Sequence, residues 1–104
     1  MADRALRVVL AEDSALLREG LLGILEQAGH QVVATATNAD ELIAAVRADP
    51  PDVVITDVRM PPAHSDEGLR AAAEIRRDHP ELPILVLSQY VADAYLPALM
   101  DSAG

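Results

Sequence analysis

The sequence predicts an α/β fold in which helices cover both faces of a doubly wound parallel sheet. Short apolar runs alternate along the chain with segments whose apolar residues recur at helical spacing, in the order βαβαβαβα. Strands that alternate with helices in this way are joined by right-handed crossovers and lie parallel. The 104 residues are enough for one compact domain, so we expect a single domain over residues 1–104.

The first strand–helix unit opens with the apolar run from Leu6 to Ala11, whose β-branched middle predicts a buried strand. A helix is expected to begin near Ser14 and to end at Gly29, because glycine is common just past a helix C-terminus. The residues at helical spacing on its predicted apolar face are Leu17, Leu21, Ile24, Leu25 and Ala28.

The second unit repeats this pattern. Gln31 to Thr37 is typical of a strand, and Asn38 with Glu41 has the spacing of a capping box at the start of a helix. Pro50 ends that helix, whose apolar face consists of Leu42, Ile43 and Val46.

The two remaining strands are apolar on successive residues, which is typical of parallel strands buried on both faces. They are expected over Val53 to Thr56 and over Pro83 to Ser88. Between them a third helix, with Leu69, Ala72 and Ile75 on its apolar face, is ended by Pro80. A fourth helix is expected over Asp93 to Ser102.

Composition excludes several classes of function. The net charge is −9, and an acidic surface repels DNA and anionic lipid, so binding of DNA by this segment itself is not expected. The absence of cysteine excludes a disulfide framework and a thiolate metal site. The apolar runs are too short to span a membrane and no signal peptide is visible at the start, so we expect no membrane partner and a cytoplasmic location.

Polar residues gather where the predicted strands end. Glu12 and Asp13 follow the first strand, Asp57 follows the third and Ser88 ends the fourth. Ligands bind at the carboxyl ends of strands in open α/β sheets, so these side chains are expected to share one crevice. Three carboxylates raise one another's pKa values there, and a hard divalent cation such as Mg²⁺ removes the conflict. Structural alternatives stay open: Asp13 or Ser14 as a helix cap, and Asp57 as a turn residue.

Three stretches carry a resemblance to a known family. They are Val8 to Asp13, Asp52 to Pro61 with its Asp-x-x-Met-Pro pattern, and Ile84 to Ser88. In this order and spacing the chain resembles the receiver domain of two-component response regulators. The longer loop before the third helix and the segment after the fourth strand resemble the LuxR/NarL-type subfamily.

The resemblance implies roles for named residues. Asp57 would accept a phosphoryl group from a sensor histidine kinase. Glu12, Asp13 and Asp57 would bind Mg²⁺ together with the backbone carbonyl of Arg59. Ser88 would hydrogen-bond the phosphoryl group and switch the domain. Such a domain takes part in its own phosphorylation without being a turnover enzyme, and it would control a DNA-binding output domain outside this chain.

The resemblance also implies a flavodoxin-like sheet, of which this chain would form strands in the order 2-1-3-4. The family's fifth strand, with its lysine, and its fifth helix are missing, because the chain stops at Gly104 and contains no lysine. The fourth strand would then be an exposed apolar edge, which invites pairing with another copy. We therefore expect a homodimer, formed through the fourth strand or through a swapped fourth helix.

Two classes of Mg²⁺-dependent enzyme fail on specific residues of the sequence, whereas an interaction module remains an alternative. Haloacid-dehalogenase-type phosphatases place Asp-x-Asp after the first strand, where Glu12 and Asp13 are adjacent instead, and Toprim-type enzymes require an acid where Arg59 stands. A pseudo-receiver would act as an interaction module without phosphorylation. The three histidines, His30, His64 and His79, show no paired ligand spacing and are expected to be solvated.

Overall fold

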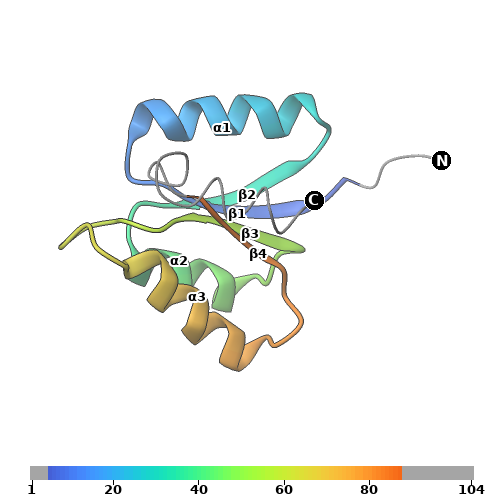
Figure 1. The fold of residues 1–104 in the computed structure, drawn as a ribbon. Helices are drawn as coiled ribbons and strands as arrows, with labels where there is room; N and C mark the ends of the chain where they lie inside the picture. The colour runs from blue at the N-terminus through green and yellow to red at the C-terminus, as the bar shows by residue number, and fades with distance from the viewer. Residues whose placement is uncertain (1–4, 88–104) are drawn as a thin grey trace, which may run out of the picture.

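The computed structural model describes residues 5–87, which form a parallel sheet with helices on both faces (Figure 1). The elements in chain order are β1 (Arg7–Ala11), α1 (Ala15–Gln27), β2 (Gln31–Ala36), α2 (Ala39–Ala48), β3 (Val53–Asp57), α3 (Glu67–Asp78) and β4 (Ile84–Leu87). The strand order is β2-β1-β3-β4, and every pairing is parallel. The predicted fold class and strand order are confirmed for this part of the chain. The fourth predicted helix lies outside the described residues.

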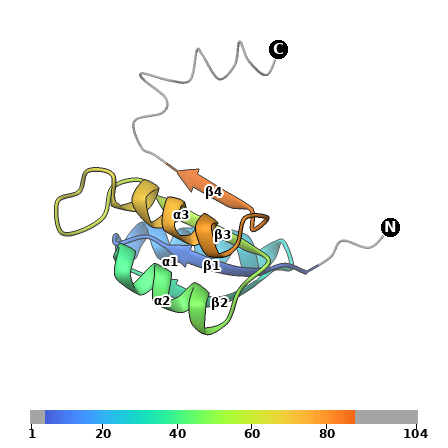
Figure 2. The same ribbon diagram turned by 90° about the horizontal axis from the view of Figure 1, so that it is seen from below.

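The sheet separates two apolar layers. Alternate residues of β1 face opposite ways: Val8 and Leu10 pack on the α1 side, whereas Val9 and Ala11 pack on the side of α2 and α3. Figure 2, seen from below, shows α2 and α3 side by side across that second face. Because both faces of the central strands are covered, their sequences are apolar on successive residues, from Val8 to Ala11 in β1 and from Val53 to Ile55 in β3, as the sequence analysis expected.

The apolar face of α1 differs from the prediction. Leu21, Leu22 and Leu25 pack against the core, whereas Leu17 is 41% and Ile24 65% exposed. No residue of this helix is fully buried. Helix α1 therefore packs on the sheet through a narrow stripe of side chains, and the residues at the edges of its predicted apolar face are exposed to solvent. At its end, Gly29 has φ +90°, the left-handed conformation expected of a glycine after a helix.

The capping box of α2 is present in a modified form. Asn38 Oδ1 accepts from the Glu41 N–H at 2.8 Å, as predicted. Glu41 does not return the bond to Asn38: its Oε1 accepts instead from the N–H and the hydroxyl of Thr37, at 2.7 and 2.8 Å. These two bonds hold the pKa of Glu41 below its usual range. The buried face of α2 consists of Leu42 and Val46, with Ile43 packed beside them.

The buried face of α3 is rotated relative to the prediction. Gly68, Ala71 and Ile75 are buried, whereas Leu69 is 48% exposed and Ala72 lies at the boundary of the core. The cause is the close approach of the first turn to β3, where a Cβ at position 68 would lie 1.7 Å from the Asp57 carbonyl oxygen. A pattern based on side-chain hydrophobicity gives glycine no weight and so selects the neighbouring face.

None of the helices within residues 5–87 has the length and apolar character needed to cross a bilayer.

Candidate phosphoacceptor and metal site

Glu12 and Asp13 follow β1 directly, at the carboxyl edge of the sheet. The Glu12 N–H continues the sheet by donating to the Ala36 carbonyl at 2.9 Å, which fixes the backbone where the strand ends. The Glu12 side chain is only 5% exposed, and its carboxylate accepts from the Ser14 N–H at 3.0 Å. Ser14 caps α1 through its hydroxyl, which accepts from the Leu17 N–H, so the capping role falls to Ser14 and leaves Asp13 available to the site.

Asp57 is the last residue of β3, the strand beside β1. It is 9% exposed, and it lies opposite Leu87 in the register with β4. Its carbonyl oxygen accepts from the hydroxyl of the buried Thr56 at 3.0 Å. The residue after it, Val58, donates its N–H to the Leu87 carbonyl and accepts from the Gly68 N–H. The backbone around Asp57 is therefore held by β4 on one side and by α3 on the other.

The three predicted carboxylates meet. Glu12, Asp13 and Asp57 each offer one oxygen, and these oxygens all lie within 4.8 Å of one another. Burial raises the pKa of Glu12 above its usual value near 4.5, and the negative charges of Asp57 and Asp13 raise it further, against the opposing hydrogen bond from Ser14. The chain thus folds with three acids held together at a sheet edge, where they repel one another.

The donor set fits a hard divalent cation. Carboxylate oxygens are the ligands that Mg²⁺ prefers, and Mg²⁺ is usually held by one or two carboxylates with water completing the octahedron. A cation between these oxygens would also remove the repulsion that raises the pKa of Glu12. Glu12, Asp13 and Asp57 are the residues that would hold it, as the sequence analysis predicted.

The other two predicted site residues stay predictions. Arg59 lies two residues after Asp57, in the loop that follows β3, and it is exposed. Ser88 follows Leu87, the partner of Asp57 in the sheet, but it lies outside the described residues.

The histidines correct an expectation of the sequence analysis. His30 is half-buried, and its Nδ1 accepts from the Leu6 N–H at 3.1 Å. His64 is exposed but is not merely solvated, because its Nε2 lies 3.1 Å from Oδ2 of Asp13. The two residues are 51 positions apart, so no local spacing in the sequence indicates this contact. The signal in the sequence is indirect: the segments that follow two parallel strands begin at the same edge of the sheet.

Comparison with known proteins shows the family to which the chain belongs. The family model of the response regulator receiver domain matches residues 8–104. Oxygen regulatory protein NreC of Staphylococcus haemolyticus is 40% identical over 92 residues, which cover 88% of this chain and 42% of that protein. The protein-glutamate methylesterase/protein-glutamine glutaminase of Natronomonas pharaonis is 37% identical over 93 residues, covering 89% of this chain and 25% of the relative. The chain thus spans less than half the length of these relatives.

Solved structures give the same result. A two-component response regulator of the LuxR family from Aurantimonas sp. SI85-9A1 superposes with a TM-score of 0.78 and 26% identity, covering 97% of this chain and 71% of that one. The response regulator PhyR from Brucella abortus has a TM-score of 0.73 and 28% identity, covering 80% of this chain and 33% of that one. With the acidic cluster at the expected edge of the expected sheet, the chain belongs to the response regulator receiver domain family.

Proposed function

We propose that this receiver domain accepts a phosphoryl group on Asp57 from a sensor histidine kinase, with Mg²⁺ bound by the neighbouring acids. The observation that carries the proposal is the convergence of Glu12, Asp13 and Asp57 within 4.8 Å at the carboxyl edge of the sheet. Three neighbouring carboxylates repel one another when no metal is bound, so the cluster lowers the stability of the metal-free fold. A pseudo-receiver that acts only as an interaction module has no need of such a cluster.

In the proposed reaction a carboxylate oxygen of Asp57 attacks the phosphorus of a phosphohistidine. A P–O bond forms, the P–N bond breaks, and its electron pair returns to the imidazole nitrogen, which leaves with a proton taken from water. Mg²⁺, when bound, supplies positive charge against the phosphoryl oxygens. Glu12 and Asp13 would hold the cation, the Arg59 carbonyl would complete the protein ligands, and Ser88 would hydrogen-bond the phosphoryl group. The chain is phosphorylated once and does not turn over as an enzyme.

The output of this signal is proposed to lie outside the 104 residues. The likeness to a LuxR-family response regulator and to NreC supports a longer protein in which the receiver controls a DNA-binding domain. The net charge of −9 also supports the assignment of DNA binding to another domain, since the receiver surface itself repels DNA.

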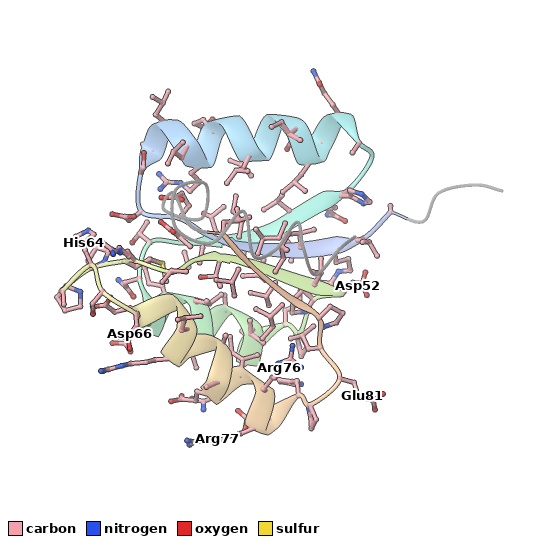
Figure 3. All side chains as sticks on the ribbon, in the orientation of Figure 1. Asp52, His64, Asp66, Arg76, Arg77 and Glu81 are labelled. Carbon is pink, nitrogen blue, oxygen red and sulfur yellow. The ribbon has the colours of Figure 1, made fainter. Side chains whose placement is uncertain are left out.

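Asp57→Asn is expected to abolish phosphorylation completely, because the amide is not a nucleophile for phosphorus. The measurement is the intact mass of the chain after incubation with Mg²⁺ and a small-molecule acyl phosphate. The unchanged chain should gain one phosphoryl group. Asp52→Asn is the matched control, because Asp52 precedes the same strand at its opposite end, where its carboxylate accepts from the Arg7 N–H (Figure 3).

Phosphorylation of the Asp57→Asn variant would show that another residue is the acceptor. If the unchanged chain is not phosphorylated and binds no Mg²⁺, but still unfolds cooperatively on heating, the pseudo-receiver is favoured. The same assay on a longer version of the chain that includes a family-like fifth strand tests whether a lysine there is required.

We also propose that two copies associate through β4. Within residues 5–87 this strand pairs only with β3, and its Leu85 is 53% exposed. An exposed apolar edge strand is a template for pairing with another chain. Leu85→Lys is expected to shift the chain to monomer in sedimentation velocity at micromolar concentrations. Leu69→Lys, at a similarly exposed leucine on α3, should leave association unchanged, and a monomeric unchanged chain would refute the proposal.

A further inference from the structure

The loop between β3 and α3 places one side chain against the acidic site. His64 Nε2 lies 3.1 Å from Oδ2 of Asp13, so residue 64 of this loop contacts the second residue after the end of β1. Figure 3 shows His64 on the loop before α3, at the end of the molecule opposite Asp52 and Glu81. A carboxylate oxygen accepts hydrogen bonds, so the contact is a hydrogen bond in the tautomer with the proton on Nε2, which then donates to Asp13.

The backbone of His64 is held in place from three directions. Its own N–H donates to the Met60 carbonyl at 2.9 Å. The amides on either side of it both donate to one carboxylate: Glu67 accepts from the Ala63 N–H at 2.9 Å and from the Ser65 N–H at 2.8 Å. Burial alone would raise the pKa of Glu67, but the N–H groups of Ser65 and Ala63 and its other backbone donors outweigh it and lower that pKa. The N–H groups of Ala63 and Ser65 thus favour the ionised form of Glu67, which accepts both hydrogen bonds.

The conformation of residue 64 is a second sign of a specific arrangement. Its φ is +54°, in the left-handed region that residues other than glycine seldom occupy. It is the one non-glycine residue with positive φ in the part of the chain that the structure describes. The loop thus adopts an uncommon backbone geometry, and in that geometry the imidazole reaches the carboxylate of Asp13.

We propose that His64 is a positioning residue for Asp13, and that it raises the affinity of the acidic site for divalent cations. The inference rests on the proposed function, in which Asp13 is a metal ligand. Among the described residues the group of mutually close donors consists of Glu12, Asp13 and Asp57, and His64 lies outside it. His64 therefore acts through Asp13: its N–H would fix the orientation of the carboxylate that holds the cation, as partners of metal ligands commonly do.

Two substitutions at position 64 test this role of His64, because their side chains differ in length. Glutamine places an amide N–H about where Nε2 of histidine lies, whereas the shorter asparagine does not extend that far but accepts the left-handed backbone well. His64→Asn should therefore keep the loop and lose the bond to Asp13, and His64→Gln should restore the bond. His79→Asn is the matched control, because His79 follows α3 at the opposite end of the sheet, where its backbone N–H donates to the Ile75 carbonyl and its carbonyl accepts from the Leu82 N–H.

The first measurement is binding of Mn²⁺, followed by the loss of the free-ion electron paramagnetic resonance signal and by competition with Mg²⁺. His64→Asn is expected to weaken binding by about threefold to tenfold, the range for loss of one hydrogen bond. His64→Gln and His79→Asn should bind as the unchanged chain does. The second measurement is the imidazole ¹⁵N resonance of His64, which should shift in Asp13→Asn without any metal present.

The outcomes separate the two proposals. Equal Mn²⁺ affinity in all variants would overturn the role of His64 and leave the metal site standing. Equal weakening by asparagine and glutamine would also overturn it, because reach to Asp13 would then not matter. An unshifted His64 resonance in Asp13→Asn would refute the contact itself. No binding of Mn²⁺ to the unchanged chain would instead remove the metal site, and the role of His64 with it.

Discussion

Replacing Gly68 by alanine is expected to destabilise the chain by about 3 kcal/mol or more, at the upper end of the range for overpacking. A Cβ at this position would lie 1.7 Å from the Asp57 carbonyl oxygen and 2.8 Å from its carbonyl carbon. Both are backbone atoms of a central strand, so no side chain can rotate away to make room. The helix cannot simply retreat, because the Gly68 N–H donates to the Val58 carbonyl at 2.8 Å.

The measurement is urea-induced unfolding followed by circular dichroism. Gly20→Ala and Gly23→Ala in α1 are matched controls, since a Cβ at either position meets nothing within 4 Å. They should stabilise the chain by about 0.5–1 kcal/mol each, because alanine favours a helix interior. An unchanged midpoint for Gly68→Ala would contradict the close approach of α3 to β3. Because the crowded atoms belong to Asp57, any folded Gly68→Ala chain should also be phosphorylated more slowly.

The strands and the acidic site could be predicted because they depend on short, local patterns. Continuous apolar runs indicate buried parallel strands, and the sheet then brings the residues after β1 and β3 together whatever the details of packing. Glu12 and Asp57 needed nothing more than strand order and direction to be placed side by side. This is why the sequence located the carboxylates correctly without any information on distances.

The helix faces and the loop depend on packing that the sequence pattern does not contain. The inner face of α3 is set by the approach of Gly68 to the Asp57 backbone, and a glycine carries no hydrophobic signal. The contact of His64 with Asp13 depends on an unusual backbone conformation and on the two amides bound by Glu67. Such features arise from specific geometry in a loop, where periodicity gives no information.

Asp57→Asn is expected to have two opposite effects, a more stable metal-free chain and a loss of metal binding. The carboxylate oxygens of the cluster lie within 4.8 Å of one another, and at that distance two like charges repel by about 1 kcal/mol even in a medium as polar as water. The amide removes the charge of Asp57 and should raise the free energy of unfolding by about that amount. The same change should weaken Mg²⁺ binding by about tenfold or more, since loss of an outer partner alone has effects of that size. Thermal unfolding with and without Mg²⁺ measures both, and Asp52→Asn should show neither effect.

The direction of the pH dependence follows from Glu12. Because its pKa is raised in the folded chain, the folded state binds the proton more tightly than the unfolded state does. The stability of the metal-free chain due to this group is thus fully present below the ordinary value near 4.5 and is lost as pH rises through the folded pKa. Glu41 and Glu67 have lowered pKa values and act in the opposite sense: the stability that they contribute is lost as pH falls through their folded pKa values. Their effect therefore lies in a lower pH range than the effect of Glu12.

Mg²⁺ should reverse the effect of Glu12. Metal binding requires deprotonated carboxylates, so the gain in melting temperature on adding Mg²⁺ should grow as pH rises through the window in which the metal-free chain loses stability. Asp57→Asn removes one of the charges that raise the pKa of Glu12, so its loss of stability above pH 4.5 should be smaller. If the metal-free chain and Asp57→Asn instead show the same pH profile, the three acids do not interact. If the profiles differ as expected, the metal-free fold holds these acids together at a cost in stability, and a bound cation or a substitution of Asp57 relieves it.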